Sequence, residues 1–279
     1  MATTTQRGFA ERRLSRPEQG PVVSIAGREI GGHMPPYIVA EISCNHGGSL
    51  GRAVSLIGRA KDAGADAVKL QTYTPRELTT PDHKELWSLY EKAHTPREWH
   101  AELFEHARQI GITIFSSAFS VEGVQFLKRL GSPAIKIASP EAQDRELLKA
   151  ADETGLPVIV SMGMGLGDYG VPLEANIMLH CIAKYPSKIE EANLGAILRW
   201  SAYGLVGLSD HTPGYETAIA ATALGAVMIE KHFKLDDDCI DSAYSLNPDE
   251  FAAMCKAVRA IHAGMGDGVI RPTCEPRSR

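Results

Sequence analysis

Residues 204–233 read GLVGLSDHTPGYETAIAATALGAVMIEKHF. This stretch contains two short apolar runs, residues 204–208 and 226–230, of the kind that forms strands buried on both faces of a sheet. Between them, residues 216–224 are predicted to form a helix that ends at Gly225. A strand, a helix and a second strand in succession indicate one β-α-β unit of a parallel sheet.

The same unit recurs along almost the whole chain. The segments AGAD, QIGIT, RLGSPA, ETGLPV and ALGAV each combine the end of a helix, a glycine and the start of a strand. Strands are predicted at residues 37–41, 67–71, 113–116, 134–138, 157–161, 177–181, 204–208 and 226–230, and helices at 50–63, 96–110, 121–130, 144–154, 193–201 and 216–224. Eight such strands in one run predict an α/β fold, the (β/α)8 or TIM barrel, preceded by a β-hairpin over residues 22–30.

One unit of the predicted barrel is irregular. Residues 162–175, between the fifth and sixth strands, read MGMGLGDYGVPLEA and are too rich in glycine for a regular helix. The barrel is therefore predicted to lack the outer helix after strand five. We expect a flexible tail over residues 1–20, a single barrel domain over 21–268, and a second tail over 269–279.

The composition is that of a globular protein, with 44% hydrophobic and 23% charged residues. A net charge of −5 argues against nucleic acid or a membrane surface as partner. No apolar run approaches the roughly 20 residues of a membrane span, and the N-terminus lacks the apolar core of a secretory signal. The five cysteines form no CxxC motif and are expected to be reduced thiols, which predicts a cytoplasmic location.

Two histidines follow the last two predicted strands. The carboxyl ends of parallel strands meet on one face of a barrel, so His211 and His232 are expected to converge on one divalent metal ion. Two imidazoles are too few for a structural zinc site but suit an open site that keeps positions for substrate. Ser209 is expected beside this metal, within reach of an anion.

Two lysines, Lys69 and Lys136, interrupt apolar strands. One lysine in a strand is more often salt-bridged than catalytic, and one serine at a strand end more often caps a helix. Many polar residues at the same end of successive strands are not explained in that way, and together they predict a cradle for phosphate and carboxylate groups. The polar residues at these ends are Glu41, Lys69, Gln71, Ser116, Ser117, Lys136, Ser139, Ser161, Tyr185, Ser209, His211 and His232.

Nine segments in order resemble the sialic acid synthase family, which condenses phosphoenolpyruvate with an amino-sugar aldehyde. They are YIVAEISCNHGGSL, AGADAVKLQTY, FSSAFS, AIKIASPE, VIVSMGM, LHCIAKYP, VGLSDHTPG, GAVMIEKHF and DSAYSLNPDEF. The phrases LYEKAHTPREWH and DSAYSL are most similar to the pseudaminic acid synthase branch. The resemblance spans residues 37 to 265, nearly the whole chain.

The resemblance implies a role for each residue that matches a family motif. The reaction would form a nonulosonic acid by C–O cleavage with release of phosphate, assisted by manganese or magnesium. The implied catalytic residues are Glu41, Lys69 and Lys136. Phosphoenolpyruvate would be bound by Lys69, Ser117, Lys136, Ser139, Ser161 and Ser209, the amino-sugar acceptor by Gln71, Glu141, Tyr185 and Asp241, and the metal by His211 and His232.

The chain also departs from the family pattern. Family members usually carry a C-terminal antifreeze-like domain that completes a partner's acceptor site, and this chain ends at Arg279, near where the linker would begin. Ala183 stands where the family has Asn or Ser, which removes a hydrogen bond to phosphate worth about 1 kcal/mol. A homodimer or a partner-dependent enzyme is predicted. Two alternatives stay open: a related condensing enzyme with an unusual acceptor, and a weakly active barrel that serves as a binding or scaffold subunit.

Overall fold

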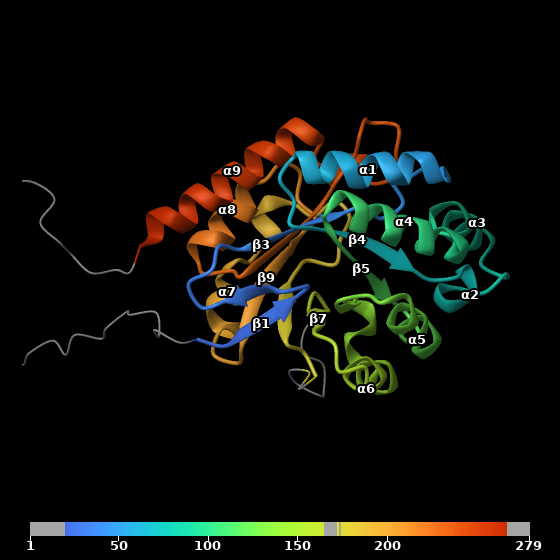
Figure 1. Ribbon diagram of the computed structural model, residues 1–279, viewed down its shortest axis with the longest axis horizontal. Coiled ribbons are helices and arrows are strands. Elements are labelled where there is room, and N and C mark those ends of the chain that lie inside the picture. Colours follow the sequence, from blue (N-terminus) through green and yellow to red (C-terminus); the bar gives the residue numbers. More distant parts are fainter. Residues whose placement is uncertain (1–19, 165–171, 173, 267–279) are drawn as a thin grey trace, which may run out of the picture.

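The computed structural model describes residues 20–164, 172 and 174–266 (Figure 1). Eight parallel strands close into a barrel because the last strand pairs with the first. The predicted TIM barrel is therefore confirmed. In order around the barrel, the strands are β3 (Tyr37–Glu41), β4 (Ala67–Thr72), β5 (Thr113–Ala118), β6 (Ile135–Ile137), β7 (Val158–Ser161), β8 (Ile177–His180), β9 (Leu205–Asp210) and β10 (Met228–His232).

Helices surround the barrel, as Figure 1 shows for α1, α4 and α9. Each predicted helix is present and ends within two residues of its expected bounds, because glycines follow most of these helices. The helices that cover the barrel are α1 (Leu50–Asp62), α4 (Arg97–Ile110), α5 (Val121–Leu130), α6 (Arg145–Asp152), α7 (Gly195–Trp200), α8 (Glu216–Ala223) and α9 (Pro248–Met265). The sequence did not predict α9, nor the pair α2 (Pro75–Leu78) and α3 (Lys84–Ala93) between β4 and α4. Short 3-10 turns occur at Pro140–Gln143, Ile189–Glu191 and Ser242–Tyr244.

The link between β7 and β8 contains no helix among its described residues, 162–164, 172 and 174–176. The remainder of the predicted loop, residues 165–171 and 173, lies outside the described residues. The predicted tails, residues 1–20 and 269–279, also lie outside them apart from Gly20.

The predicted hairpin is confirmed as β1 (Val22–Ile25) and β2 (Arg28–Gly31), an antiparallel pair. Its side chains Ile25 and Ile30 are fully buried and join the apolar cluster inside the barrel, which includes Tyr37 and Met228. The hairpin therefore closes the amino-terminal end of the barrel and leaves the other end for ligands.

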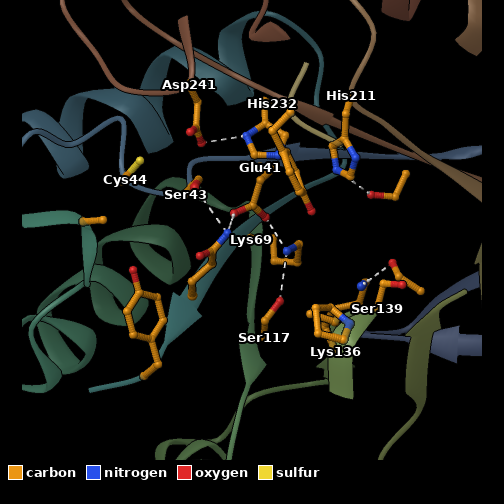
Figure 2. Close-up of a pocket in the computed structure, with 18 of the residues that line it drawn as sticks. Glu41, Ser43, Cys44, Lys69, Ser117, Lys136, Ser139, His211, His232 and Asp241 are labelled. Atoms are coloured by element: carbon orange, nitrogen blue, oxygen red, sulfur yellow. Dashed lines mark hydrogen bonds and ion pairs between the residues drawn. The ribbon is translucent and has the colours of Figure 1, made fainter. Parts of the chain in front are cut away.

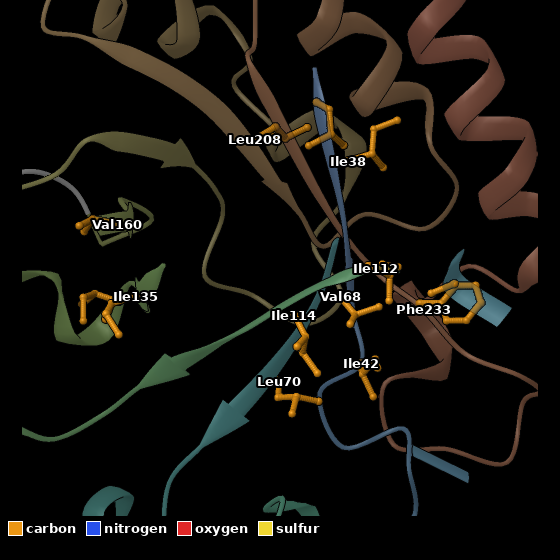
Figure 3. Close-up of a cluster of buried hydrophobic side chains, with 14 of the residues drawn as sticks. Ile38, Ile42, Val68, Leu70, Ile112, Ile114, Ile135, Val160, Leu208 and Phe233 are labelled. Carbon is orange, nitrogen blue, oxygen red and sulfur yellow. The ribbon is translucent and has the colours of Figure 1, made fainter. Parts of the chain in front are cut away.

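Alternation along the strands separates two kinds of surface. Residues that face outward, such as Ile38, Val68 and Leu208, are apolar and pack beneath the helices (Figure 3). Residues that face inward are apolar near the start of each strand and polar near its end, as Ala67 and Lys69 illustrate in β4. The polar groups are thereby concentrated at the carboxyl end of the barrel.

The barrel interior is tightly filled at Gly207 of β9. A Cβ atom at this position would lie 2.4 Å from the Met228 carbonyl oxygen and 2.7 Å from a Leu179 methyl group. Glycine is required here because the backbones of β9 and β10 approach each other closely. Within the described residues, no helix has both the length and the apolar character that a membrane crossing requires.

A buried histidine gives the fold a pH-dependent contact. His46 Nδ1 accepts a hydrogen bond from the Gly48 N–H at 3.1 Å, and Nε2 lies 3.3 Å from Thr95 Oγ1. Thr95 precedes α4 and makes this contact with its hydroxyl, and Pro96 is the N-cap residue of α4. Burial, together with the charges of His94 and His100, lowers the pKa of His46 from 6.5 to about 4.

We expect this contact to weaken in acid. Because the folded-state pKa is lower than the unfolded value, the stabilisation is complete above pH 6.5 and is lost as the pH falls towards 4. Acidification from pH 7 to pH 5 should lower the free energy of unfolding by about 2 kcal/mol through His46 alone. Denaturant unfolding of the parent and of His46→Asn at both pH values isolates this contribution, and equal pH dependence of the two proteins would contradict it.

Candidate active site

The carboxyl end of the barrel contains a pocket of about 570 Å³ (Figure 2). Every residue that the sequence placed in the site lines this pocket: Glu41, Lys69, Gln71, Ser117, Lys136, Ser139, Glu141, Ser161, Tyr185, Ser209, His211, His232 and Asp241. Ser116 is an exception among the strand-end residues. It faces outward, and its hydroxyl pairs with Thr72 Oγ1 at 2.7 Å under α4. The assigned roles of the lining residues stay predictions.

Lys69 is a buried cation between two carboxylates. Its Nζ lies 2.5 Å from Glu41 Oε2 and 3.7 Å from Glu230 Oε1, and it donates to Ser117 Oγ at 3.0 Å. Burial alone would lower the pKa of Lys69, but the charges of Glu230 and Glu41 raise it overall. Lys69 is therefore charged, and it holds both carboxylates at the floor of the pocket.

Lys136 is a buried lysine in a different environment. Its Nζ donates to Ser161 Oγ at 2.6 Å and to the Ile137 carbonyl oxygen at 3.1 Å, and no described carboxylate forms an ion pair with it. Burial and the charge of Lys69 lower its pKa, against the opposing charge of Glu230. A buried ammonium group without an anionic partner is unfavourable in the free protein, so Lys136 is suited to a ligand that brings negative charge.

Three serines around these lysines accept hydrogen bonds from the protein, so each can donate its own proton to a ligand. Ser117 Oγ and Ser161 Oγ accept from Lys69 and Lys136, and Ser139 Oγ accepts from the Met164 N–H at 2.9 Å. Each hydroxyl thus keeps its own proton for another acceptor, such as an anionic ligand. Ser209 differs, because its hydroxyl donates to Glu230 Oε1 at 2.9 Å. The sequence did not predict this carboxylate partner of Ser209, and the phosphate-binding role of Ser209 stays a prediction.

His211 and His232 lie next to each other, with ring centroids 5.5 Å apart, and their role as metal ligands stays a prediction. The Nδ1 atom of His211 lies 2.9 Å from the Ile182 carbonyl oxygen, and Nδ1 of His232 lies 3.0 Å from Asp241 Oδ2. These acceptors assign the proton of each neutral ring to Nδ1, so that each Nε2 carries a lone pair that could bind a metal; Nε2 of His211 also lies 3.5 Å from Ser209 Oγ. Burial and the neighbouring His232 lower the pKa of His211 to about 4, which keeps that imidazole neutral.

The residues therefore fit a divalent ion with an open coordination sphere. In the described part of the chain, no group of three or more His, Cys, Asp or Glu side chains could form a closed metal site. Two imidazoles would leave the remaining positions to water and substrate, as a catalytic metal requires. Whether the chain holds such an ion stays a proposal.

A buried ion pair behind the histidines joins the ends of β9 and β10. Lys231 Nζ lies 3.0 Å from Asp210 Oδ2, and both side chains are almost fully buried on the outer face of the barrel. The same carboxylate accepts from the Thr217 hydroxyl and from Thr212. Asp210 and Lys231 immediately precede His211 and His232, so this pair fixes the two histidine backbones relative to each other.

The residues that are predicted to contact the amino-sugar substrate include polar groups that are still available to a ligand. Gln71 Nε2 donates to Glu41 Oε1 and Ser43 Oγ, both at 3.2 Å, which leaves its amide oxygen as an acceptor. Glu141 Oε2 is buried without a hydrogen-bond partner, and burial raises the pKa of Glu141. The Asp241 carboxylate is hydrogen-bonded to His232 and Tyr244, and its contact with the acceptor stays a prediction.

Three features of the pocket were missed by the sequence analysis. Glu230 faces inward with His232, two residues away, and the period-2 alternation of β10 could have revealed it. Ser43 carries a positive φ, for which the sequence gives no signal. The third feature is an apolar wall contributed by Leu78, Leu89, Ala93, Phe119 and Ile240.

A closed barrel with a polar pocket at the carboxyl ends of its strands is the arrangement found in TIM-barrel enzymes, and this protein has that arrangement. Residues 56–270, more than half of the chain, match the model of the NeuB family. The chain belongs to the NeuB family, and like its named relatives it is a carbon–carbon bond-forming enzyme of the transferase type.

Individual relatives agree with this assignment. The pseudaminic acid synthase of Campylobacter jejuni is 43% identical over 258 residues, which cover 83% of this chain and 75% of that protein. The pseudaminic acid synthase of Helicobacter pylori is 41% identical over 260 residues, covering 84% and 76%. The structure of N-acetylneuraminic acid (sialic acid) synthetase from Leptospira borgpetersenii, in complex with citrate, has a TM-score of 0.85 and 32% identity, covering 91% of this chain and 93% of that one. The predicted resemblance to the sialic acid synthase family and its pseudaminic branch is confirmed.

Proposed function

We propose that this enzyme joins phosphoenolpyruvate to an amino-sugar aldehyde and forms a nonulosonic acid of the pseudaminic type. The names of the relatives support the product class. The single observation that carries the phosphoenolpyruvate assignment is Lys136, a buried lysine that donates to Ser161 and has no carboxylate ion pair among the described residues. A phosphate group supplies the charge that this position lacks.

The two ends of phosphoenolpyruvate are assigned to the two lysines. Lys136, Ser139 and Ser161 bind the phosphate, while Lys69 and Ser117 bind the carboxylate. C3 of phosphoenolpyruvate then forms a bond to the aldehyde carbon of the sugar, and water adds at C2. Glu41 accepts a proton from this water and passes it to the former aldehyde oxygen, which becomes a hydroxyl group. The C2 hydroxyl then becomes the ketone as the bond between C2 and the phosphate oxygen breaks, and its proton leaves with the inorganic phosphate.

The histidine pair faces the same reacting centre. His211 and His232 would hold manganese or magnesium through Nε2, and the bound ion would supply polarisation of the aldehyde oxygen. Asp241 keeps the His232 ring in the tautomer that this role needs. Tyr185, whose ring centroid is 4.2 Å from that of His211, shields the imidazole from the open side.

The apolar wall supports an acceptor with more than one methyl-bearing substituent. Leu89 and Ala93 come from α3, Phe119 follows β5, and Ile240 lies on the loop after β10. None of these side chains can form a hydrogen bond with a sugar hydroxyl. Acetamido and deoxy groups fit such a wall better than a row of hydroxyl groups does.

Phosphate release from phosphoenolpyruvate tests the proposal. The assay contains manganese or magnesium and a panel of mono- and di-N-acetylated amino sugars, with mass spectrometry of the product. We expect phosphate release that requires both sugar and metal, and a product whose mass is the sum of sugar and pyruvate. Release with simple aldehydes alone would favour the related condensing enzyme, and no release with any aldehyde would favour a scaffold. Light scattering tests the predicted homodimer.

A further inference from the structure

Tyr73 lines the pocket directly after the end of β4. Lys69 and Gln71 of that strand line the pocket too, so Tyr73 continues the same period-2 alternation, one step farther from the interior of the barrel. The residue is only 3% exposed. It therefore lies above the polar floor of the pocket, and the proposed reaction does not use it.

The ring of Tyr73 is held within the apolar wall by two other rings. Its centroid lies 5.3 Å from that of Phe119 and 5.8 Å from that of Tyr90, and both contacts are edge-to-face. Phe119 is a residue of the wall, and Tyr90 lies on α3 between the wall residues Leu89 and Ala93. The ring is thus fixed between β4 and the α3 side of the pocket.

The hydroxyl of Tyr73 has no partner in the protein. Among the described residues, no group forms a hydrogen bond with it. The oxygen is not fully enclosed by protein atoms, so the small accessible part of the residue includes its donor group. Burial raises the pKa of Tyr73, and the phenol therefore keeps its proton at neutral pH. A nearly buried hydroxyl without a partner is unfavourable in the free protein and suits a ligand that supplies an acceptor atom.

An acetamido group has the two features that this part of the pocket can satisfy. Its methyl group is apolar and packs against apolar side chains. Its amide carbonyl oxygen loses water when the group enters an apolar wall, which is unfavourable unless a donor replaces that water. A donor fixed among the wall residues meets this requirement, whereas the wall residues themselves provide none.

We propose that the Tyr73 hydroxyl donates a hydrogen bond to the carbonyl oxygen of an acetamido group on the acceptor, whose methyl group packs against Leu89, Ala93 and Phe119. The group concerned is the one remote from the aldehyde carbon, because Tyr73 lies farther along its strand from Lys69 than Gln71 does. Tyr73 is then a residue that determines acceptor specificity. The inference rests on the proposed function for the identity of the acceptor as an amino sugar.

One substitution isolates the hydroxyl. Tyr73→Phe removes it and keeps the ring between Phe119 and Tyr90. Tyr203→Phe is the matched control, since Tyr203 is 64% exposed and precedes β9 at the opposite, amino-terminal end of the barrel. Two sugars are compared: a di-N-acetylated amino sugar, and its analogue in which a hydroxyl replaces the acetamido group remote from the aldehyde. The readouts are kcat/KM for each sugar, the KM for phosphoenolpyruvate, the Tm, and the dissociation constant of each sugar without phosphoenolpyruvate by saturation-transfer NMR.

Tyr73→Phe should lower kcat/KM for the di-N-acetylated sugar about tenfold and weaken its binding by a similar factor, because one hydrogen bond is lost. For the analogue, both values should change less than about twofold, as should the KM for phosphoenolpyruvate. The Tm should stay the same or rise, because the hydroxyl has no partner in the free protein. Tyr203→Phe should match the parent in every measurement.

Parental kinetics and binding of the di-N-acetylated sugar in Tyr73→Phe would overturn the inference. An equal loss for the two sugars, or a lower Tm without a difference between them, would reduce Tyr73 to a structural residue and would also overturn it. If the parent converts no sugar but binds the di-N-acetylated one, the proposed function fails and the binding comparison still decides the role of Tyr73. A parent that neither converts nor binds that sugar overturns both.

Discussion

His232→Ala is expected to lower kcat by at least about a thousandfold, equivalent to roughly 4 kcal/mol of transition-state stabilisation. The substitution removes one of the two imidazoles that line the pocket among the described residues, and it leaves the Asp241 carboxylate with Tyr244 as its remaining side-chain partner. His211→Ala should have a comparable effect, because neither ring can hold a divalent ion alone. Steady-state phosphate release with saturating substrates measures the loss.

His33→Ala is the control for this prediction, since His33 is exposed and belongs to the opposite, amino-terminal end of the barrel. It should retain parental activity and Mn²⁺ affinity. Circular dichroism of all three variants should match the parent, which separates loss of the metal from loss of the fold. Full activity of His232→Ala, or activity that survives dialysis against a chelator, would refute the metal assignment.

Lys136→Met is expected to weaken phosphoenolpyruvate binding by about 2–3 kcal/mol, or roughly 30- to 150-fold, because a charge-assisted contact to phosphate is lost. The same substitution should not reduce the thermal stability of the ligand-free protein. Lys136 is buried without a carboxylate ion pair among the described residues, so an apolar side chain of similar size should leave the Tm unchanged or raise it. Isothermal calorimetry and thermal unfolding measure the two effects.

Lys69→Met provides the contrast. It leaves Glu41 and Glu230 buried beside each other without their shared cation, so it should lower the free energy of unfolding by about 3 kcal/mol or more. A fall in the Tm of Lys136→Met comparable to that of Lys69→Met, with unchanged calorimetric affinity, would mean that Lys136 has a structural role.

The barrel could be predicted because its signals are local. Short apolar segments and a glycine after most helices, such as Gly111 and Gly131, set the order of elements without any knowledge of tertiary contacts. The helices α2 and α3 could not be predicted in this way. Helix α3 has no buried residue, because it lies outside the regular strand–helix alternation and its side chains Leu89 and Ala93 line the pocket instead of the core.

The sequence predicted which residues line the pocket better than it predicted the hydrogen bonds between them. Strand ends converge in any parallel barrel, which is why Lys69, Lys136 and His232 could be placed together from position alone. Hydrogen-bond partners depend on rotamers and on loops from distant parts of the chain. For this reason the partner of Ser209, the orienting role of Asp241 and the left-handed backbone of Ser43 emerged only from the structure.

The residues Leu78, Leu89 and Ala93 of the apolar wall lie on the insertion that forms α2 and α3, whereas the lysines and histidines lie on strands or directly after them. The insertion is anchored through few side chains: Glu77 of α2 pairs with Arg97 at 3.4 Å and accepts from Ser120. Exchange of residues 74–93 is therefore expected to change this wall without altering the lysines and histidines of the pocket, while Thr95 keeps its contact with His46. Grafting this segment between relatives offers a direct route to redesigned acceptor selectivity.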